Sequence, residues 1–226
     1  MIYVDSIKNI YRVDESNAEI VQQRKKRREV CREERRRQQE EQHRCAWELL
    51  QYACQKEYGI CSLEELEILK TEYGKPYSRA YPDLHFNLSH CQSGCACVLA
   101  ENPVGIDIER KFTVRDAFVR RICTDKEQQV MRELSSEEQQ HLIQVLWSMK
   151  ESAVKQNGRG LGYGVERLDF SEQLALYLEK IPDGKNGVPI SLTGAAGQNF
   201  IIQSTSEYTL AVCGRSLTEK IEFVER

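Results

Sequence analysis

The sequence predicts a mixed α/β protein of two parts, each with a small sheet packed on a long helix. Helical patterns occupy residues 45–53 and about 114–155, and shorter alternating stretches typical of strands surround both of them. The turn-forming pair Asn102-Pro103 falls between the two parts. Because no low-complexity linker separates them, we expect tightly packed parts at residues 1–101 and 102–226.

The first part opens with an apolar stretch, Ile2–Tyr11, that predicts a strand. The segment Ser16–Glu19 has the spacing of a capping box, so we expect a helix to open near residue 17. Cys45–Ala53 is typical of a helix that faces the core. Between Arg24 and Arg44 lie ten Lys or Arg and five Glu residues, and we expect most of this run to be a solvated helix.

The remaining elements follow from breaks and alternation along the chain. Tyr73–Tyr77 predicts a turn, because glycine and proline both interrupt regular structure there. His85–His90 alternates like a strand, and Cys95–Ala100 is its expected hairpin partner. The glycines of Asn157–Gly162 end the long helical region. Three short strands are expected after it: Leu174–Leu178, Asn199–Ser204 and Tyr208–Val212.

Composition excludes several classes of protein. With 40% hydrophobic residues, 30% charged residues and a net charge of −3, the chain gives no general case for binding nucleic acid or a membrane. No apolar run is long enough to cross a bilayer, and we expect no signal sequence. The nine cysteines contain no Cys-x-x-Cys pair. We therefore expect buried, reduced thiols in a cytoplasmic protein, not metal ligands or nucleophiles.

Three carboxylates in two distant segments are the best clue to function. Asp107 and Glu109 alternate with apolar residues, so a strand would send both to one face, with Cα atoms roughly 7 Å apart. Glu151 and Lys155 are four residues apart and share one face of a helix. Oxygen ligands of this kind suit Mg²⁺, which usually also binds substrate phosphates, and Mn²⁺ accepts the same ligands.

Taken separately, these residues also have ordinary explanations. Asp107 and Glu109 could pair with neighbouring arginines at the end of the strand. Glu151 and Lys155 could form a surface ion pair worth roughly 0.3–0.5 kcal/mol. His90 could be a core histidine with a backbone partner. The order of the surrounding motifs is what favours a site.

Four motifs occur in a fixed order along the chain: Gly74-Lys75-Pro76, Phe86–His90, Gly105–Glu109 and Trp147–Lys155. Together they closely resemble the 4′-phosphopantetheinyl transferases of the surfactin-synthetase-activating (Sfp) type. The resemblance implies an α/β pseudodimer, in which two similar halves form the active site at their junction, and a monomeric protein. It also implies transfer of 4′-phosphopantetheine from coenzyme A to a serine hydroxyl of an acyl or peptidyl carrier protein, with release of adenosine 3′,5′-bisphosphate.

The resemblance also implies roles for individual residues. Asp107, Glu109 and Glu151 would hold Mg²⁺, and Lys155 would lie near the phosphates and assist the leaving group. Phosphoryl transfer relies on such charge neutralisation more than on covalent help from the protein. The residues implied in binding coenzyme A, with Lys155, are Arg28, Arg44, Gly74, Lys75, Pro76, Ser89 and His90.

Two questions stay open at this level. The base that deprotonates the carrier serine is Glu127, which we favour, Glu151 or water. The carrier is not specified: fatty-acid, polyketide, nonribosomal-peptide and lysine pathways all use one.

A non-catalytic module that binds coenzyme A or a carrier is the rival class of protein. Arg35–Arg37 could instead bind nucleic acid, but the interleaved glutamates disfavour this; we expect them to steer an acidic carrier.

Overall fold

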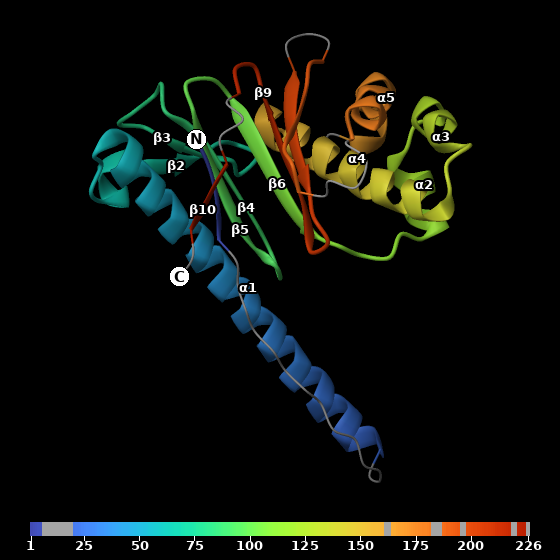
Figure 1. The fold of residues 1–226 in the computed structure, drawn as a ribbon. Coiled ribbons are helices and arrows are strands. Elements are labelled where there is room, and N and C mark those ends of the chain that lie inside the picture. Colours follow the sequence, from blue (N-terminus) through green and yellow to red (C-terminus); the bar gives the residue numbers. More distant parts are fainter. Residues whose placement is uncertain (6–19, 161–163, 182–186, 195–197, 218–220, 225–226) are drawn as a thin grey trace.

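The fold is seen in a computed structural model of the chain (Figure 1). It describes residues 1–5, 20–160, 164–181, 187–194, 198–217 and 221–224, and for residues 3–5, 20–29 and 223 the backbone alone. Within this part of the chain, no helix is both long and apolar enough to cross a membrane.

The first sheet has the strand order β10 (Ile221–Val224), β1 (Ile2–Asp5), β5 (Gly94–Ala100), β4 (His85–Cys91). β4 and β5 form the expected antiparallel hairpin. β10 pairs with β1 in parallel, so residues close to the C-terminus return to the first sheet. The division at residue 101 therefore stays a prediction.

Helix α1 (Ile20–Tyr58) covers this sheet with its C-terminal half only. Ala46, Leu49, Leu50 and Ala53 are buried, because apolar residues recur there on one face of the helix. The preceding half extends away from the body of the molecule, and every residue from 30 to 37 is exposed (Figure 1). The predicted solvated helix is thus confirmed for this segment.

A short hairpin connects α1 to the sheet. It follows the 3-10 turn η1 (Leu63–Leu66) and consists of β2 (Ile68–Lys70) and β3 (Pro76–Ser78). Gly74 lies in the loop between these strands with a φ of 84°, a conformation that glycine adopts without steric penalty. The turn predicted at this position is confirmed.

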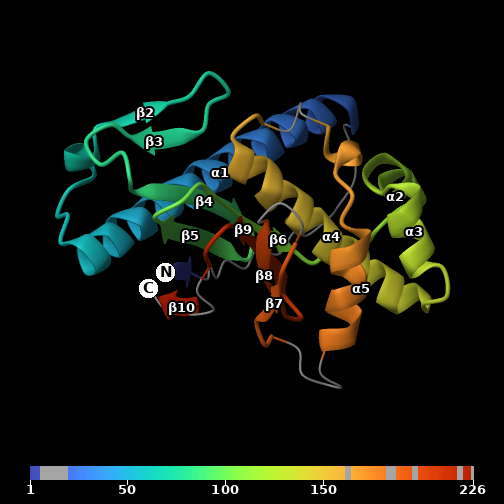
Figure 2. The ribbon, with the colours of Figure 1, turned by 90° about the horizontal axis from the view of Figure 1, so that it is seen from above.

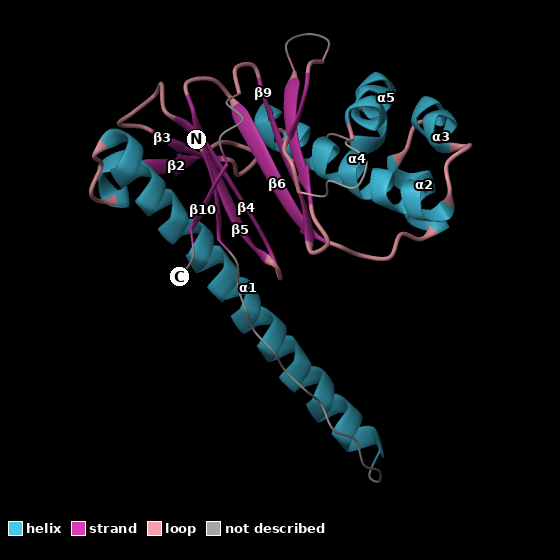
Figure 3. Ribbon diagram, viewed as in Figure 1, coloured by secondary structure: helices cyan, strands magenta, loops and turns pink. Residues whose placement is uncertain are grey.

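The second sheet is antiparallel, with strand order β6 (Val104–Arg110), β9 (Tyr208–Gly214), β8 (Asn199–Ser204), β7 (Ile190–Leu192). Helix α4 (Ser136–Asn157) packs across β6 and β9, and Gly158 ends it in the left-handed conformation (Figure 2). Around α4 lie α2 (Asp116–Ile122), α3 (Asp125–Met131), η3 (Val165–Arg167) and α5 (Ser171–Lys180) (Figure 3).

One predicted strand is wrong. Leu174–Leu178 belongs to helix α5, not to a strand. Leu174 and Tyr177, three residues apart, are the buried pair, so the helical spacing decides the structure over the apolar alternation. The strand predicted as far as Tyr11 is observed as β1, Ile2–Asp5, and its later residues lie outside the described part, as does the helix start predicted near residue 17.

The two sheets meet where β4 lies beside β6. The amide of Ile106 donates to Asn87 Oδ1 at 2.9 Å, and the amide of Ile108 donates to Ser89 Oγ at 3.2 Å. Side chains of one sheet thus satisfy backbone donors at the edge of the other. Ile106 and Ile108 also share a buried core with Val98 of the first sheet. The expected tight packing between the two parts is confirmed.

Candidate functional site

Gly105 brings helix α4 close to strand β6. A Cβ atom at this position would lie 2.0 Å from the carbonyl oxygen of Ser152 and 2.4 Å from the amide nitrogen of Gln156. Any larger residue would therefore collide with the helix backbone. The close contact sets Asp107, two residues along the strand, against the face of α4 that carries Lys155.

Asp107, Ser89 and Lys155 form one hydrogen-bonded group. Lys155 Nζ donates to Asp107 Oδ1 at 2.7 Å and to Ser89 Oγ at 2.9 Å. Ser89 Oγ lies 3.2 Å from the same Asp107 oxygen. Asp107 is 3% exposed, and its other oxygen, Oδ2, is buried with no hydrogen-bond partner among the described residues. That oxygen is an acceptor available to a ligand.

Glu109 and Glu151 lie within electrostatic range of Asp107. Burial, and next the negative charge of Asp107, raise the pKa of each glutamate to about 7. Trp147 opposes this at Glu109, because its indole N–H donates to Glu109 Oε1 at 3.4 Å. Lys155 opposes it at both glutamates. The structure therefore brings the three predicted carboxylates and Lys155 into one electrostatically coupled cluster.

The donor set of this cluster suits a hard divalent cation. It offers carboxylate oxygens that repel one another, and the partnerless Asp107 Oδ2. As they stand, however, no three His, Cys, Asp or Glu side chains of the described residues form a group that could hold a metal ion. Lys155 takes up one oxygen of Asp107 instead. The chemistry fits a cation, while the geometry is not that of a closed metal site.

Lys75 connects the two halves beside this cluster. Its ammonium donates to the carbonyl oxygens of Val104, at 2.9 Å, and Gln156, at 3.0 Å. Burial lowers its pKa to about 8. Gly74 and Pro76 lie on either side of it, at the turn and at the start of β3. Their predicted contacts with coenzyme A stay predictions.

His90 has a neighbour that the sequence analysis missed. Its ring lies edge-on to that of His43, with centroids 6.3 Å apart. Burial, then His43, then Lys155 lower the pKa of His90, so His90 lies within electrostatic range of Lys155. The indole N–H of Trp47 donates to His43 Nε2 at 3.0 Å, which orients the ring. The one feature of the sequence that could have indicated this place for His43 is its position four residues before Trp47, on the helix that faces the core.

The two predicted arginines contribute less to this group. Arg44 is exposed, and its guanidinium donates to Glu48 one helical turn away at 2.6 Å. The side chain of Arg28 lies outside the described part of the chain. The structure thus sets His43, not Arg44, beside His90, and the phosphate-binding roles of the two arginines stay predictions.

Glu127 lies elsewhere. It is completely buried, and Lys150 Nζ and the amide of Thr124 both donate to its Oε2 at 2.7 Å. The amide of Phe170 donates to its Oε1 at 2.8 Å. A general base needs an oxygen that a substrate proton can reach. With both oxygens occupied and no exposure, Glu127 does not meet that requirement in this structure.

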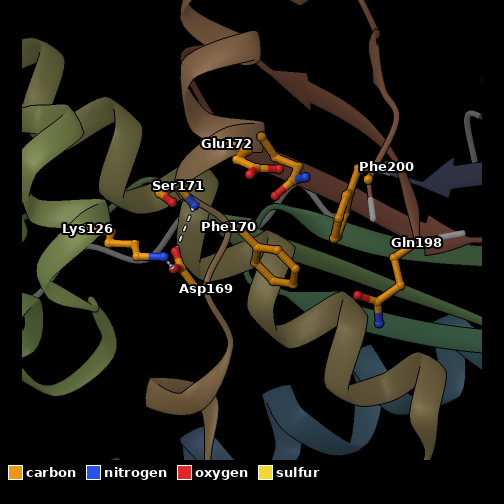
Figure 4. A pocket seen from close by; sticks show the side chains of 9 residues that line it. Lys126, Asp169, Phe170, Ser171, Glu172, Gln198 and Phe200 are labelled. Atoms are coloured by element: carbon orange, nitrogen blue, oxygen red, sulfur yellow. Dashed lines mark hydrogen bonds and ion pairs between the residues drawn. The ribbon is translucent and has the colours of Figure 1, made fainter. Parts of the chain in front are cut away.

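A pocket of about 230 Å³ lies apart from the cluster, at the start of α5 (Figure 4). Asp169 forms an ion pair with Lys126 at 3.5 Å and accepts from the amide of Ser171 at 3.1 Å. Phe170 and Phe200 meet edge to face with ring centroids 5.0 Å apart. None of its lining residues is a predicted site residue, so it does not redefine the site.

Comparison with known proteins relates this chain to the 4′-phosphopantetheinyl transferases. The family model of the 4′-phosphopantetheinyl transferase superfamily matches residues 103–213. A 4′-phosphopantetheinyl transferase of Bacillus subtilis is 34% identical over 167 residues, which is 73% of this chain and 70% of that protein. The 4′-phosphopantetheinyl transferase Sfp of Bacillus subtilis strain 168 is 33% identical over 126 residues, 56% of this chain and 55% of that protein. A human L-aminoadipate-semialdehyde dehydrogenase-phosphopantetheinyl transferase is 34% identical over 121 residues, 46% of this chain and 38% of that protein.

Proposed function

This chain belongs to the 4′-phosphopantetheinyl transferase superfamily, and we propose that it transfers 4′-phosphopantetheine from coenzyme A to a serine hydroxyl of an acyl or peptidyl carrier protein. Adenosine 3′,5′-bisphosphate is the second product. The observation that supports this function best is the buried group of Asp107, Lys155 and the neighbouring glutamates at the junction of the sheets. A binding module would not need coupled acids of this kind.

The reaction exchanges one phosphorus–oxygen bond for another. The serine oxygen bonds to the phosphorus next to the pantetheine, and the bond from that phosphorus to the adenosine bisphosphate breaks. Glu151 accepts the serine proton, because of the two candidate carboxylates it is the one that belongs to the cluster at the junction. The Lys155 ammonium stabilises the negative charge that grows on the leaving phosphate.

A magnesium ion is part of this proposal. Asp107, Glu109 and Glu151 would hold it, and the buried Asp107 Oδ2 without a described partner supports that assignment. When bound, the ion supplies charge neutralisation at the pyrophosphate. Manganese is the alternative, because it accepts the same oxygen ligands.

The coenzyme A site is proposed along the same junction. Ser89 and His90, at the end of β4, would contact the phosphates together with Lys155. Gly74, Lys75 and Pro76 would line the adenine side. Lys75 lies at the junction with its ammonium bonded to Val104 and Gln156, and this supports the proposal. Arg28 and Arg44 belong to the proposal by motif position only.

Further features are proposed on the same basis. The two halves, divided near residue 101, would be related as a pseudodimer, with β10 from the second half completing the four-stranded sheet of the first. The protein would act as a cytoplasmic monomer. One relative is named for L-aminoadipate-semialdehyde dehydrogenase, so the carrier domain of such an enzyme is a candidate substrate. Fatty-acid, polyketide and peptide carriers are the others.

Intact-mass measurement of a carrier protein tests the function. Apo carriers of each class are incubated with this protein, coenzyme A and Mg²⁺, and a matched sample contains EDTA. We expect a mass gain of one phosphopantetheine that EDTA removes. No gain on any carrier, together with tight coenzyme A binding by titration, would favour the non-catalytic module instead.

A further inference from the structure

Four cysteines meet where helix α1 packs on strand β5. Cys45 and Cys54 come from the helix, and Cys95 and Cys97 come from the strand. Cys45 and Cys95 are 50 residues apart in sequence, yet their sulfur atoms are in direct contact at 2.7 Å. Because a disulfide requires side chains that face each other at short range, this pair meets the first condition for one.

The contact lies at the proposed coenzyme A site. Cys45 follows His43 and Arg44 on α1. Cys95 is the cross-strand partner of His90 in the β4–β5 hairpin. A bond between the two sulfurs would therefore join the helix that carries His43 to the strand beside His90.

We propose that Cys45 and Cys95 form a reversible disulfide when the protein meets a low-molecular-weight disulfide such as oxidised glutathione. The bond ties the middle of α1 to β5 and fixes the position of His43 relative to His90. It concerns a covalent modification of this chain, so it stands independently of the transferase activity.

The exchange balances in two steps. The Cys45 thiolate, which is half-buried, attacks oxidised glutathione, so that a mixed disulfide forms and one glutathione thiolate leaves. The buried Cys95 thiolate then attacks the Cys45 sulfur, which forms the protein disulfide and releases the second glutathione. The two thiol protons end on the two glutathione molecules, which are reduced while the protein is oxidised.

Two other cysteines of this region are less suited to the first step. Cys54 and Cys97 are completely buried, so oxidised glutathione does not reach them, whereas Cys45 is half-buried. Burial also raises the pKa of Cys54 to about 11 and that of Cys97 well above its usual value, which lowers their thiolate fraction. Cys95 is as buried as they are, but it reacts only with the Cys45 sulfur in contact with it. Cys31 and Cys61 are exposed, on α1 and after its end. These two serve as internal controls, because oxidised glutathione reaches them without forming the cross-link.

The experiment treats the full chain with oxidised glutathione, blocks remaining thiols with an alkylating reagent, and maps peptides by mass spectrometry without reduction. We expect a peptide pair joined through Cys45 and Cys95, lighter than the two thiol peptides by two hydrogen atoms. The melting temperature should rise by a few degrees, because the cross-link closes a long loop. Addition of dithiothreitol should reverse both changes.

Matched variants decide the assignment. Cys45→Ser should remove the joined peptides and the rise in melting temperature, whereas Cys61→Ser should keep both. Cys95→Ala is a second variant on the other side of the contact, and its oxidised form should carry glutathione on Cys45. Recovery of Cys45 fully alkylated after treatment of the wild-type protein, with Cys31 and Cys61 glutathionylated, would overturn the proposal.

Discussion

Helix α4 carries two lysines that each bind a carboxylate at 2.7 Å. In the pair that we call saturated, Lys150 and Glu127, both carboxylate oxygens accept hydrogen bonds; in the unsaturated pair, Lys155 and Asp107, one oxygen has no described partner. Lys150 and Glu127 are completely buried, and both oxygens of Glu127 accept hydrogen bonds within the protein. Lys155 is 29% exposed, and its partner Asp107 keeps one buried oxygen without a described partner.

We propose that this difference separates a structural pair, Lys150 and Glu127, from a functional one, Lys155 and Asp107. Glu127 is bonded to α4 through Lys150 and to the start of α5 through the amide of Phe170, so the pair holds three helices together. Asp107 instead has unused hydrogen-bonding capacity at a junction rich in acids. Removal of one partner from a buried pair whose oxygens are all hydrogen-bonded destabilises the fold, whereas a buried oxygen without a partner is able to accept from a ligand.

The largest expected effect comes from breaking the saturated pair. Glu127→Ala leaves the buried Lys150 ammonium without its carboxylate, and we expect a loss of about 3–5 kcal/mol in the free energy of unfolding. Urea denaturation measures it. The double variant Glu127→Leu, Lys150→Met should recover much of the loss, since no buried charge is left unpaired. A loss below about 1 kcal/mol in the single variant would contradict the structural assignment.

The next effect comes from separating α4 from β6. Gly105→Ala forces a methyl group into the backbone at Ser152 and Gln156, so we expect a loss of about 1–3 kcal/mol in stability. Transfer activity should fall further than the folded fraction, because Lys155 moves away from Asp107. Thermal melting and a carrier-protein mass assay measure the two. Unchanged activity in a destabilised variant would show that the contact does not position the site.

Acidity should affect the unsaturated cluster in the metal-free protein. Burial and Asp107 raise the pKa of Glu151 from 4.5 to about 7, so between those values the folded chain holds a proton that the unfolded chain has released. This carboxyl group therefore lowers stability as pH rises through that window, by about 1–2 kcal/mol after allowance for solvent screening.

The variant Asp107→Asn tests this contribution, because it removes one cause of the raised pKa at both Glu151 and Glu109. Urea denaturation in EDTA at several pH values should give a shallower decline for the variant than for the wild-type protein. Identical slopes for the two proteins would show that Asp107 acts on neither glutamate. Mg²⁺ should stabilise the wild-type protein more at pH 7 than at pH 5, because the ion competes with protons for the carboxylates.

An exposed ion pair provides the smallest effect. Arg36 and Glu40 lie 3.5 Å apart on the extended half of α1, with side chains 72% and 67% exposed. Arg36→Ala should change the free energy of unfolding by no more than about 0.5 kcal/mol.

If Arg35–Arg37 steer an acidic carrier, replacing these three arginines by glutamine should raise the KM for the carrier more than that for coenzyme A. An unchanged carrier KM would end that hypothesis.

Features with local signals could be predicted from the sequence. The strand that carries Asp107 and the helix that carries Glu151 follow from periods of two and four residues, and both are observed. The apolar residues of Leu174–Leu178 fit a strand and a helix equally over so short a run. The segment is helical because Leu174 and Tyr177 are buried together on one face of α5.

Features that depend on distant partners could not be predicted. The environment of Glu127 is set by Lys150 and Phe170, 23 and 43 residues away, and no local pattern identifies such contacts. The need for glycine at position 105 arises from the approach of α4, and the place of His43 arises from the fold of β4. Motif order predicted the site, and the structure separates Glu127 from the three acids that lie together.

The most direct test of the distinction is the rate of phosphopantetheine transfer by Asp107→Ala, measured on a carrier protein that the wild-type enzyme modifies. We predict a loss of about 10²–10³-fold in rate in a variant that is fully folded under the assay conditions, because we propose that the residue serves a ligand. Full activity in the folded variant would contradict the assignment of the unsaturated pair as the catalytic centre.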